Sequence, residues 1–244
     1  MEVHKHSHHE THKKKWTAYL LEFFMLFLAV FLGFVAENIR EERVEHKRAH
    51  EFADRLLADL TNDTSWFNKE IYRIKRQQPN MNEAIQLLIQ PIPATDADVL
   101  KKSFSNNINY VSDAKLNTAT YNQMRSSGSL RYIHNSELTI ALQDYYEVRV
   151  PGATEASQYT KKFFDEYIKS FFIEQLRNQD MHAMQDTSKS WKPLIFGRNR
   201  QTDQRLSNIV AMDQTQLEIA TMFYRSALQK ATTLIQIINK EYNK

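Results

Sequence analysis

The stretch YLLEFFMLFLAVFLGFVAENIREE, residues 19–42, decides how the N-terminal part of the chain folds. Across residues 16–36 only Thr17 and Glu22 are clearly polar. A helix of about 20 residues spans about 30 Å, the thickness of the hydrocarbon core of a bilayer. Because no comparable apolar run occurs elsewhere, the sequence predicts one transmembrane helix over 16–36, with the lipid bilayer as its partner.

A cleaved signal peptide is the competing interpretation of this stretch. Basic residues precede an apolar run from Phe23 to Ala36, as in a secretory signal. A cut after Ala36 would place the bulky Phe34 where a small residue is preferred. The helical pattern also continues into ENIREERVEHKRAHEF, so we favour an uncleaved anchor.

Glu22 is a carboxylate within the apolar run, and the small residues explain its position. At about 100° per residue, Ala18, Ala29, Gly33 and Ala36 all lie within about 40° of Glu22 around the helix. Ala29 and Gly33 form a small-xxx-small pair that lets two helices approach closely. We therefore predict a helix–helix interface on this face, where a carboxylate meets protein rather than lipid. The alternative is that Glu22, near the helix start, extends to the lipid headgroups.

The flanks of the predicted span indicate its orientation. Residues 1–15 form a basic, His-rich tail, and Lys13, Lys14 and Lys15 directly precede the apolar run, whereas Glu37 follows it. Positive residues prefer the cytoplasmic side. We expect a single-pass protein of the inner (cytoplasmic) membrane, with a cytoplasmic N-terminus and a periplasmic C-terminal domain.

Histidines near the N-terminus raise the question of metal binding. A flexible tail would hold its histidines in no fixed geometry for a metal ion, so we expect residues 1–15 to be a solvated basic tail. Glu42, His46 and His50 share one helix face but lack a fourth ligand. We expect no metal and no cofactor.

Composition bounds the fold class and excludes several functions. The chain has 244 residues, only four Gly and five Pro, and no Cys. Few turn-forming residues favour long helices, and the missing Cys excludes disulfides and thiol catalysis. With 32 basic against 29 acidic residues, nothing indicates a nucleic-acid partner.

The region after the span is predicted to be all-α. A charged stalk helix over 37–78 is expected to end at Pro79, with TNDTS at 61–65 either interrupting it or capping a new helix. Residues 79–244 are expected to form an antiparallel helical bundle that packs with the stalk.

Several boundaries within the bundle follow from turn and cap signals. Gly128 is expected to cap a helix at its C-terminus, and Asn135 to start another that stops near Pro151. The last long helix is expected over roughly 203–241, and residues 154–178 form an amphipathic stretch. Further expectations are a capping box over 95–98, a short helix over 82–90, and a long loop over 186–203.

The turn MRSSGSLRYIHN, residues 124–135, is the clearest candidate for ligand binding. Backbone amides around Gly128, with Ser127, Arg125 and Arg131 nearby, could hold an anion. An ordinary turn between helices explains the same residues. No nucleophile–base pair, P-loop, Gly-rich dinucleotide turn or zinc-protease motif occurs, so we expect no enzyme.

Two stretches carry a resemblance to a family. The first is the apolar helix with Glu22 and its ENIREE exit, and the second is TATYNQMRSSGSLRYIHNSELTIALQDYY over 118–146. In both, the chain resembles a group of uncharacterised single-pass membrane proteins of Bacteroidota. The resemblance implies a bacterial envelope protein and no known activity.

Three hypotheses for function follow from the sequence. The first is a membrane-anchored scaffold or accessory subunit of an envelope complex, acting as a homo-oligomer or with a membrane protein partner. The second is an extracytoplasmic sensor of a small ligand that signals through a partner. The third, less favoured, is an ion-coupled motor-type subunit using Glu22.

Overall fold

The chain is all-α in the computed structural model, as the composition predicts. The structure describes residues 16–89, 113–175 and 199–242, and every element within them is a helix. η1 is a 3₁₀ helix, and η2 and η3 are π-helical turns. The elements are α1 (Trp16–Ile89), α3 (Ala119–Ser126), η1 (Ser129–Tyr132), α4 (Ser136–Asp144), η2 (Tyr145–Arg149), α5 (Val150–Phe163), η3 (Phe164–Ile168), α6 (Lys169–Gln175) and α8 (Arg200–Tyr242).

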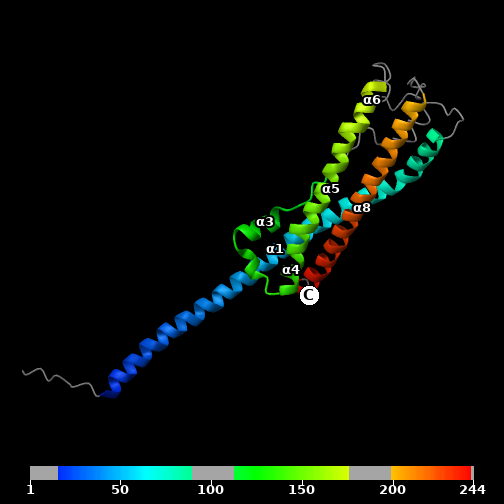
Figure 1. Cartoon of the computed structure of the whole chain (residues 1–244). Coiled ribbons are helices and arrows are strands. Elements are labelled where there is room, and N and C mark those ends of the chain that lie inside the picture. Colours follow the sequence, from blue (N-terminus) through cyan, green and yellow to red (C-terminus); the bar gives the residue numbers. More distant parts are fainter. Residues whose placement is uncertain (1–15, 90–112, 176–198, 243–244) are drawn as a thin grey trace, which may run out of the picture. The chain divides into compact units, whose positions relative to one another are not determined.

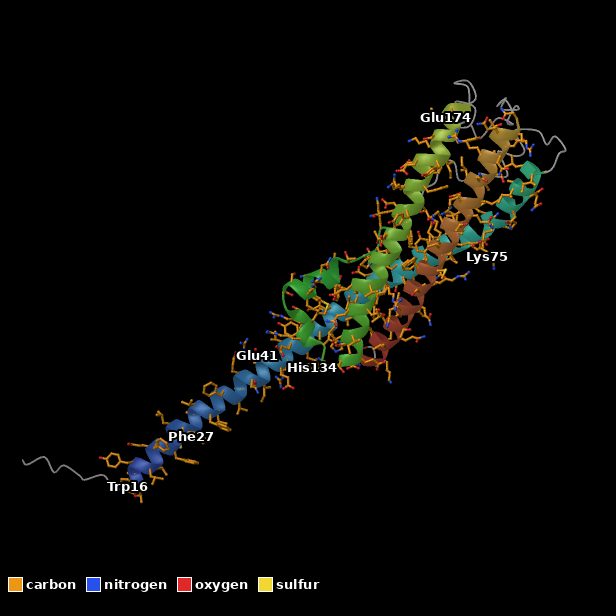
Figure 2. The ribbon with its side chains drawn as sticks, viewed as in Figure 1. Trp16, Phe27, Glu41, Lys75, His134 and Glu174 are labelled. Carbon is orange, nitrogen blue, oxygen red and sulfur yellow. The ribbon has the colours of Figure 1, made fainter. Side chains whose placement is uncertain are left out.

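The chain divides into two units, Met1–His50 and Glu51–Lys244, and the division falls within α1. In the first unit the described residues all belong to α1. An 18-residue window of this helix has a mean hydropathy of 2.3, and none of it is buried. The labelled side chains of Trp16 and Phe27 project outward from the helix in Figure 2. This part of α1 is a candidate membrane span.

The second unit is built from three long helical rods, which Figure 1 shows side by side. They are α1 from Glu51 onward, the continuous run from α4 to α6, and α8. Side-chain contacts show that α8 runs antiparallel to both others. Gln78 and Asn82 of α1 contact Glu218 and Gln214 of α8, and Asp144 and Glu174 of the second rod pair with Lys230 and Arg205. The short α3 and η1 come between α1 and α4 in the sequence and lie beside α1 in Figure 1.

Burial along α1 from Ala49 to Leu88 repeats every seven residues, in alternating steps of three and four. One set of buried positions is apolar throughout, whereas the second contains polar residues at three successive repeats. A repeat of this kind places one narrow face of a helix against its neighbours. We call the second set the polar seam after its central members, Asp63, Glu70 and Gln77. The apolar set is Ala53, Leu60, Phe67, Ile74, Met81 and Leu88.

The predicted end of the stalk at Pro79 is wrong. Pro79 lies inside α1, which continues to Ile89 and thereby absorbs the separate short helix expected over 82–90. TNDTS neither interrupts nor caps the helix. The seven-residue repeat explains both outcomes, because Met81, Ala84 and Leu88 continue the buried face beyond the exposed Pro79. Tertiary packing therefore outweighs the local cost of Pro.

The predicted stop near Pro151 is also wrong. The helical run continues through Pro151, which lies at the start of α5 immediately after the π-helical turn η2. In that turn the backbone N–H of Val150 donates to the carbonyl of Tyr145. Pro151 has no backbone N–H to donate, and the altered hydrogen-bond register of the π-turn accommodates it. The helical run therefore continues instead of ending.

Other boundaries agree with the sequence. Gly128 follows α3 with φ of 69°, in the left-handed region, and Asn135 caps α4 by accepting from the N–H of Leu138 at 3.2 Å. α8 spans Arg200–Tyr242, close to the expected helix. The tail 1–15, the capping box over 95–98 and most of the loop over 186–203 lie outside the described residues.

Candidate functional site

A buried carboxylate on α1 forms the centre of the most polar region of the core. Asp63 is 1% exposed. Its Oδ1 accepts from the backbone N–H of Asn117 at 2.9 Å and from Asn117 Nδ2 at 2.8 Å, and its Oδ2 accepts from the Tyr145 hydroxyl at 2.8 Å. Asp63 therefore joins three parts of the chain: α1, the segment before α3, and η2. We call Asp59, Asp63, Asn117, Tyr145 and Tyr146 the Asp63 cluster.

Burial and hydrogen bonding act in opposite directions on Asp63. Burial raises the pKa of its carboxyl, and the negative charge of Asp59 acts in the same direction. The three hydrogen bonds from Asn117 and Tyr145 lower it, but the balance stays above the ordinary value. The same burial, with the charge of Asp63, raises the pKa of Tyr145 far above its ordinary value, so Tyr145 remains a hydrogen-bond donor.

The π-helical turn η2 begins at two successive buried tyrosines. An adjacent buried pair, Ala141 and Leu142, also occurs one turn earlier in α4, so the turn changes the buried register that follows it rather than burying the tyrosines. Here Tyr145 and Tyr146 are both buried, and the buried positions after the turn are shifted by one residue, to Val150 and Ala153. π-turns of this kind often occur at functional sites.

Tyr146 stacks against Tyr121 of α3, with ring centroids 4.5 Å apart and planes 11° from parallel. The hydroxyl of Tyr121 donates to Glu147 at 2.6 Å, and burial with this contact raises the pKa of Tyr121 to about 12. By contrast, the Tyr146 hydroxyl is buried without a hydrogen-bond partner among the described residues, as is Oδ2 of Asp59. Unpaired buried polar atoms are rare in folded proteins.

The next polar layer of the seam contains an internal ion pair. Glu70 is 1% exposed and accepts from Arg73 Nε at 2.9 Å, while Arg73 also donates to Gln77 at 3.1 Å. Arg73 thus contacts two of the three polar seam residues, Glu70 and Gln77. Breaking such a pair on one side leaves an uncompensated charge in the core.

Asp213 on α8 is the described carboxyl with a pKa near neutrality. Burial raises its pKa to about 7, and the nearby charge of Arg73 only partly opposes the shift. Asp213 occupies a position of the seven-residue repeat of α8, between Leu206 and Ala220, where the other members are apolar. The side chain is therefore partly withdrawn from water, and it forms no ion pair within the described part of the chain.

Ser157 links the segment before α3 to α8. Its hydroxyl oxygen accepts from the backbone N–H of Ala114 at 3.0 Å, and it is hydrogen-bonded to Tyr224. Burial nonetheless raises the pKa of Tyr224 to about 12. Ser157 and Asp63 together hold residues 113–118, which carry no helix, against the helical rods.

The polar side chains of the turn predicted to bind an anion do not converge on one point. Arg125 lies 3.8 Å from Glu147, and Arg131 stacks over the ring of Tyr132 at 5.2 Å. Ser127 donates to the carbonyl of Gln123 and shares a 2.7 Å contact with Ser129. Gly128 supplies the left-handed turn. These contacts are those of a helix-to-helix turn, and an anion site stays a prediction.

On the predicted interface face of the candidate span, the described part of the chain leaves most of the small residues exposed. Glu22, Ala29, Gly33 and Ala36 are exposed and Ala18 is half-buried. A Cβ added at Gly33 would meet nothing within 4 Å. His46 and His50 contact each other through their rings at 4.7 Å, and no group of three metal-ligating side chains that includes Glu42 occurs in the described part of the chain.

Sequence reasoning missed the Asp63 cluster and the polar seam. The signal was present, since Asp63, Glu70 and Gln77 recur at seven-residue intervals between apolar positions. We found no match to this chain among protein-family models, curated proteins or solved structures. The arrangement supplies buried hydrogen-bond acceptors and cation-compatible oxygens rather than a nucleophile with an adjacent base.

Proposed function

We propose that the protein is a single-pass, membrane-anchored helical subunit that assembles with a second copy or with another membrane protein. The observation that carries the proposal is the unburied apolar window of α1, together with the open face around Gly33. Apolar side chains that no described part of the chain covers need lipid or protein around them. The small residues on that face favour a protein neighbour on one side.

Mass measurement in mild detergent tests the assembly. Gly33→Leu adds bulk to the small-residue face and is expected to convert an oligomer into a monomer. Phe31→Leu is the matched control, because Phe31 lies about 180° from Glu22 around the helix and faces lipid. A wild-type monomer, or an oligomer that tolerates Gly33→Leu, would contradict self-assembly through this face and leave another membrane protein as the partner to test by co-purification with the wild type and with Gly33→Leu.

We further propose that the anchor lies in the inner membrane of a bacterium with its N-terminus in the cytoplasm. The cluster of Lys13–Lys15 before the span supports this orientation. The chain has no Cys, so single cysteines report topology cleanly. Ser157 is unsuitable for labelling because it is 1% exposed, whereas Gln229 on α8 is exposed. A membrane-impermeant maleimide should label Gln229→Cys in intact cells and leave Ser7→Cys unlabelled; the reverse pattern would invert the topology.

A groove between two helices favours the sensor as a second candidate function. It lies between α5–η3 and the beginning of α8, and its volume is about 930 Å³. Such a volume suits a small ligand. Its apolar lining comes from Phe163, Tyr167, Ile209 and Met212, and Arg200 and Arg205 lie at its polar part.

A thermal-shift screen on the full chain in detergent tests this candidate. A true ligand raises the melting temperature of the wild type and loses that effect in Met212→Arg. Met222→Arg is the control, since Met222 is exposed on the same helix but does not line the groove. A ligand that stabilises all three proteins equally does not bind in this groove.

A further inference from the structure

We propose that the Asp63 cluster binds a small monovalent cation, held by the carboxylate of Asp59 and the hydroxyl of Tyr146. The proposal concerns a site in the second unit and does not depend on assembly through the membrane helix.

The first argument is placement. Asp59 and Asp63 are four residues apart on α1, so their side chains lie on the same side of the helix, one turn apart. Tyr145 donates to Asp63 at 2.8 Å, and Tyr146 follows it in the π-helical turn. The charges of Asp59 and Asp63 both act on Tyr146, which places the two carboxylates and this phenol in one neighbourhood.

The second argument is the pair of unsatisfied atoms. Tyr146 is 5% exposed, and both its hydroxyl and Oδ2 of Asp59 are buried without a partner among the described residues. Each such atom destabilises the fold when nothing replaces its water. Two oxygens in the same neighbourhood are the ligands that a hard cation prefers.

The third argument is charge. Asp59 and Asp63 make no ion pair with Lys, Arg or His among the interactions of the described residues. Hydrogen bonds from Asn117 and Tyr145 satisfy the oxygens of Asp63 without neutralising it. Asp59 is half-buried, with Oδ2 on its buried side, and it lies one helix turn from the buried Asp63. A bound water would satisfy the free oxygens of Asp59 and Tyr146 but would leave the two neighbouring carboxylates without a counter-charge. A cation satisfies both requirements.

The ligand set also limits the kind of cation. Divalent Ca²⁺ takes 6–8 oxygen ligands, but both Asp63 oxygens are already occupied by donors. No group of three His, Cys, Asp or Glu side chains able to hold a metal ion occurs within 16–89, 113–175 and 199–242. Na⁺ or K⁺ makes smaller demands on the number of charged ligands and would complete its shell around the two free oxygens with water.

The experiment is thermal unfolding of the full chain in detergent, in NaCl, KCl, CaCl₂ or choline chloride at one constant ionic strength. At about ten times the dissociation constant, the bound ion is expected to raise the melting temperature by about 3–6 °C over choline. Asp59→Asn and Tyr146→Phe should each abolish the difference between the ions. Asp54→Asn, an exposed carboxylate on the same helix, should retain it.

Three outcomes would overturn the site. Equal melting temperatures in Na⁺, K⁺ and choline would show that the oxygens bind water only. Stabilisation by Ca²⁺ alone would exclude a monovalent ion. An ion effect that persists in Tyr146→Phe and is lost in Asp54→Asn would place the ion on the surface. Tyr146→Phe keeps the ring stack with Tyr121, so it serves as the decisive variant if Asp59→Asn fails to fold.

Discussion

At the scale of single residues, Asp63 contributes more to the fold than its polar character suggests. Replacing it with Ala leaves the donors of Asn117 and Tyr145 buried without an acceptor. We expect Asp63→Ala to lower the free energy of unfolding by about 3–5 kcal/mol. Urea unfolding followed by far-UV circular dichroism measures the change.

Two further variants separate this effect from a general loss of helix stability. Tyr145→Phe removes one of the hydrogen bonds to Asp63 and should cost about 1–1.5 kcal/mol, less than Asp63→Ala. Asp54→Ala, at an exposed position of α1, should change stability by less than about 0.5 kcal/mol. Equal effects of Asp63→Ala and Asp54→Ala would show that the network contributes nothing.

Asp213 gives the molecule a pH dependence with a definite sign. Its pKa of about 7 in the folded chain exceeds the ordinary Asp value, so the folded state holds more protons between the two values. Stability therefore falls as pH rises through this window and is lowest once Asp213 is ionised, above about pH 7. The raised pKa of Asp63 acts in the same direction.

Asp213→Asn should remove the part of the pH dependence of stability that is due to this carboxyl. Between about pH 5.5 and pH 7.5 we expect the free energy of unfolding of the wild type to fall by about 1–2 kcal/mol relative to that of the Asn variant. This figure allows for the partial exposure of Asp213. Unfolding midpoints at several pH values give the comparison. Parallel pH profiles for the two proteins would show that Asp213 titrates at its ordinary value.

At the scale of elements, the turn after α3 depends on one glycine. Gly128 has φ of 69°, and a Cβ there meets nothing within 4 Å, so the cost of a side chain is conformational rather than steric. We expect Gly128→Ala to destabilise by about 1–2 kcal/mol and Gly128→Asn by less, because Asn tolerates the left-handed region. Thermal unfolding of the two variants tests this explanation. Equal losses of stability in Gly128→Ala and Gly128→Asn would mean that the left-handed backbone conformation is not the cause of the destabilisation.

Pro79 is the other element-scale prediction. It lies on the exposed side of α1 and removes one backbone hydrogen bond from a helix whose packing continues to Leu88. Pro79→Ala should therefore stabilise the protein by about 1–3 kcal/mol. A loss of stability instead would indicate that a Pro-induced bend is needed for Met81 and Leu88 to reach the core.

The elements also show what the sequence predicts well and what it does not. Asn135, Gly128 and the limits of α8 were predicted because capping and periodicity are local signals. The sequence does not predict that the helices continue through Pro79 and Pro151. Burial against distant helices decides the first case, and a π-helical turn decides the second. The Asp63 cluster escaped for the same reason: Asn117 and Tyr145 are 54 and 82 residues away from Asp63.

At the scale of the whole molecule, the division at His50 and Glu51 predicts a separable part. The buried core belongs to the second unit apart from Ala49, and the candidate span belongs to the first. We expect residues 51–244 to be helical and soluble without detergent, with a urea midpoint close to that of the whole chain. Circular dichroism and gel filtration test this, and an aggregated or unfolded fragment would show that the anchor helix is needed for folding.

The polar seam has a mechanical consequence for α1. Sliding the helix by one turn, about 5.4 Å, would bring apolar Leu60 or Phe67 towards the Tyr145 hydroxyl and displace Asp63 into apolar surroundings. Each mismatched layer would cost about 1–3 kcal/mol, and Asp63, Glu70 and Gln77 would be displaced together. These three residues therefore oppose sliding of α1 along its axis. A pull along the helix axis would be transmitted through the second unit as through a rigid rod, instead of being absorbed by slippage between its helices.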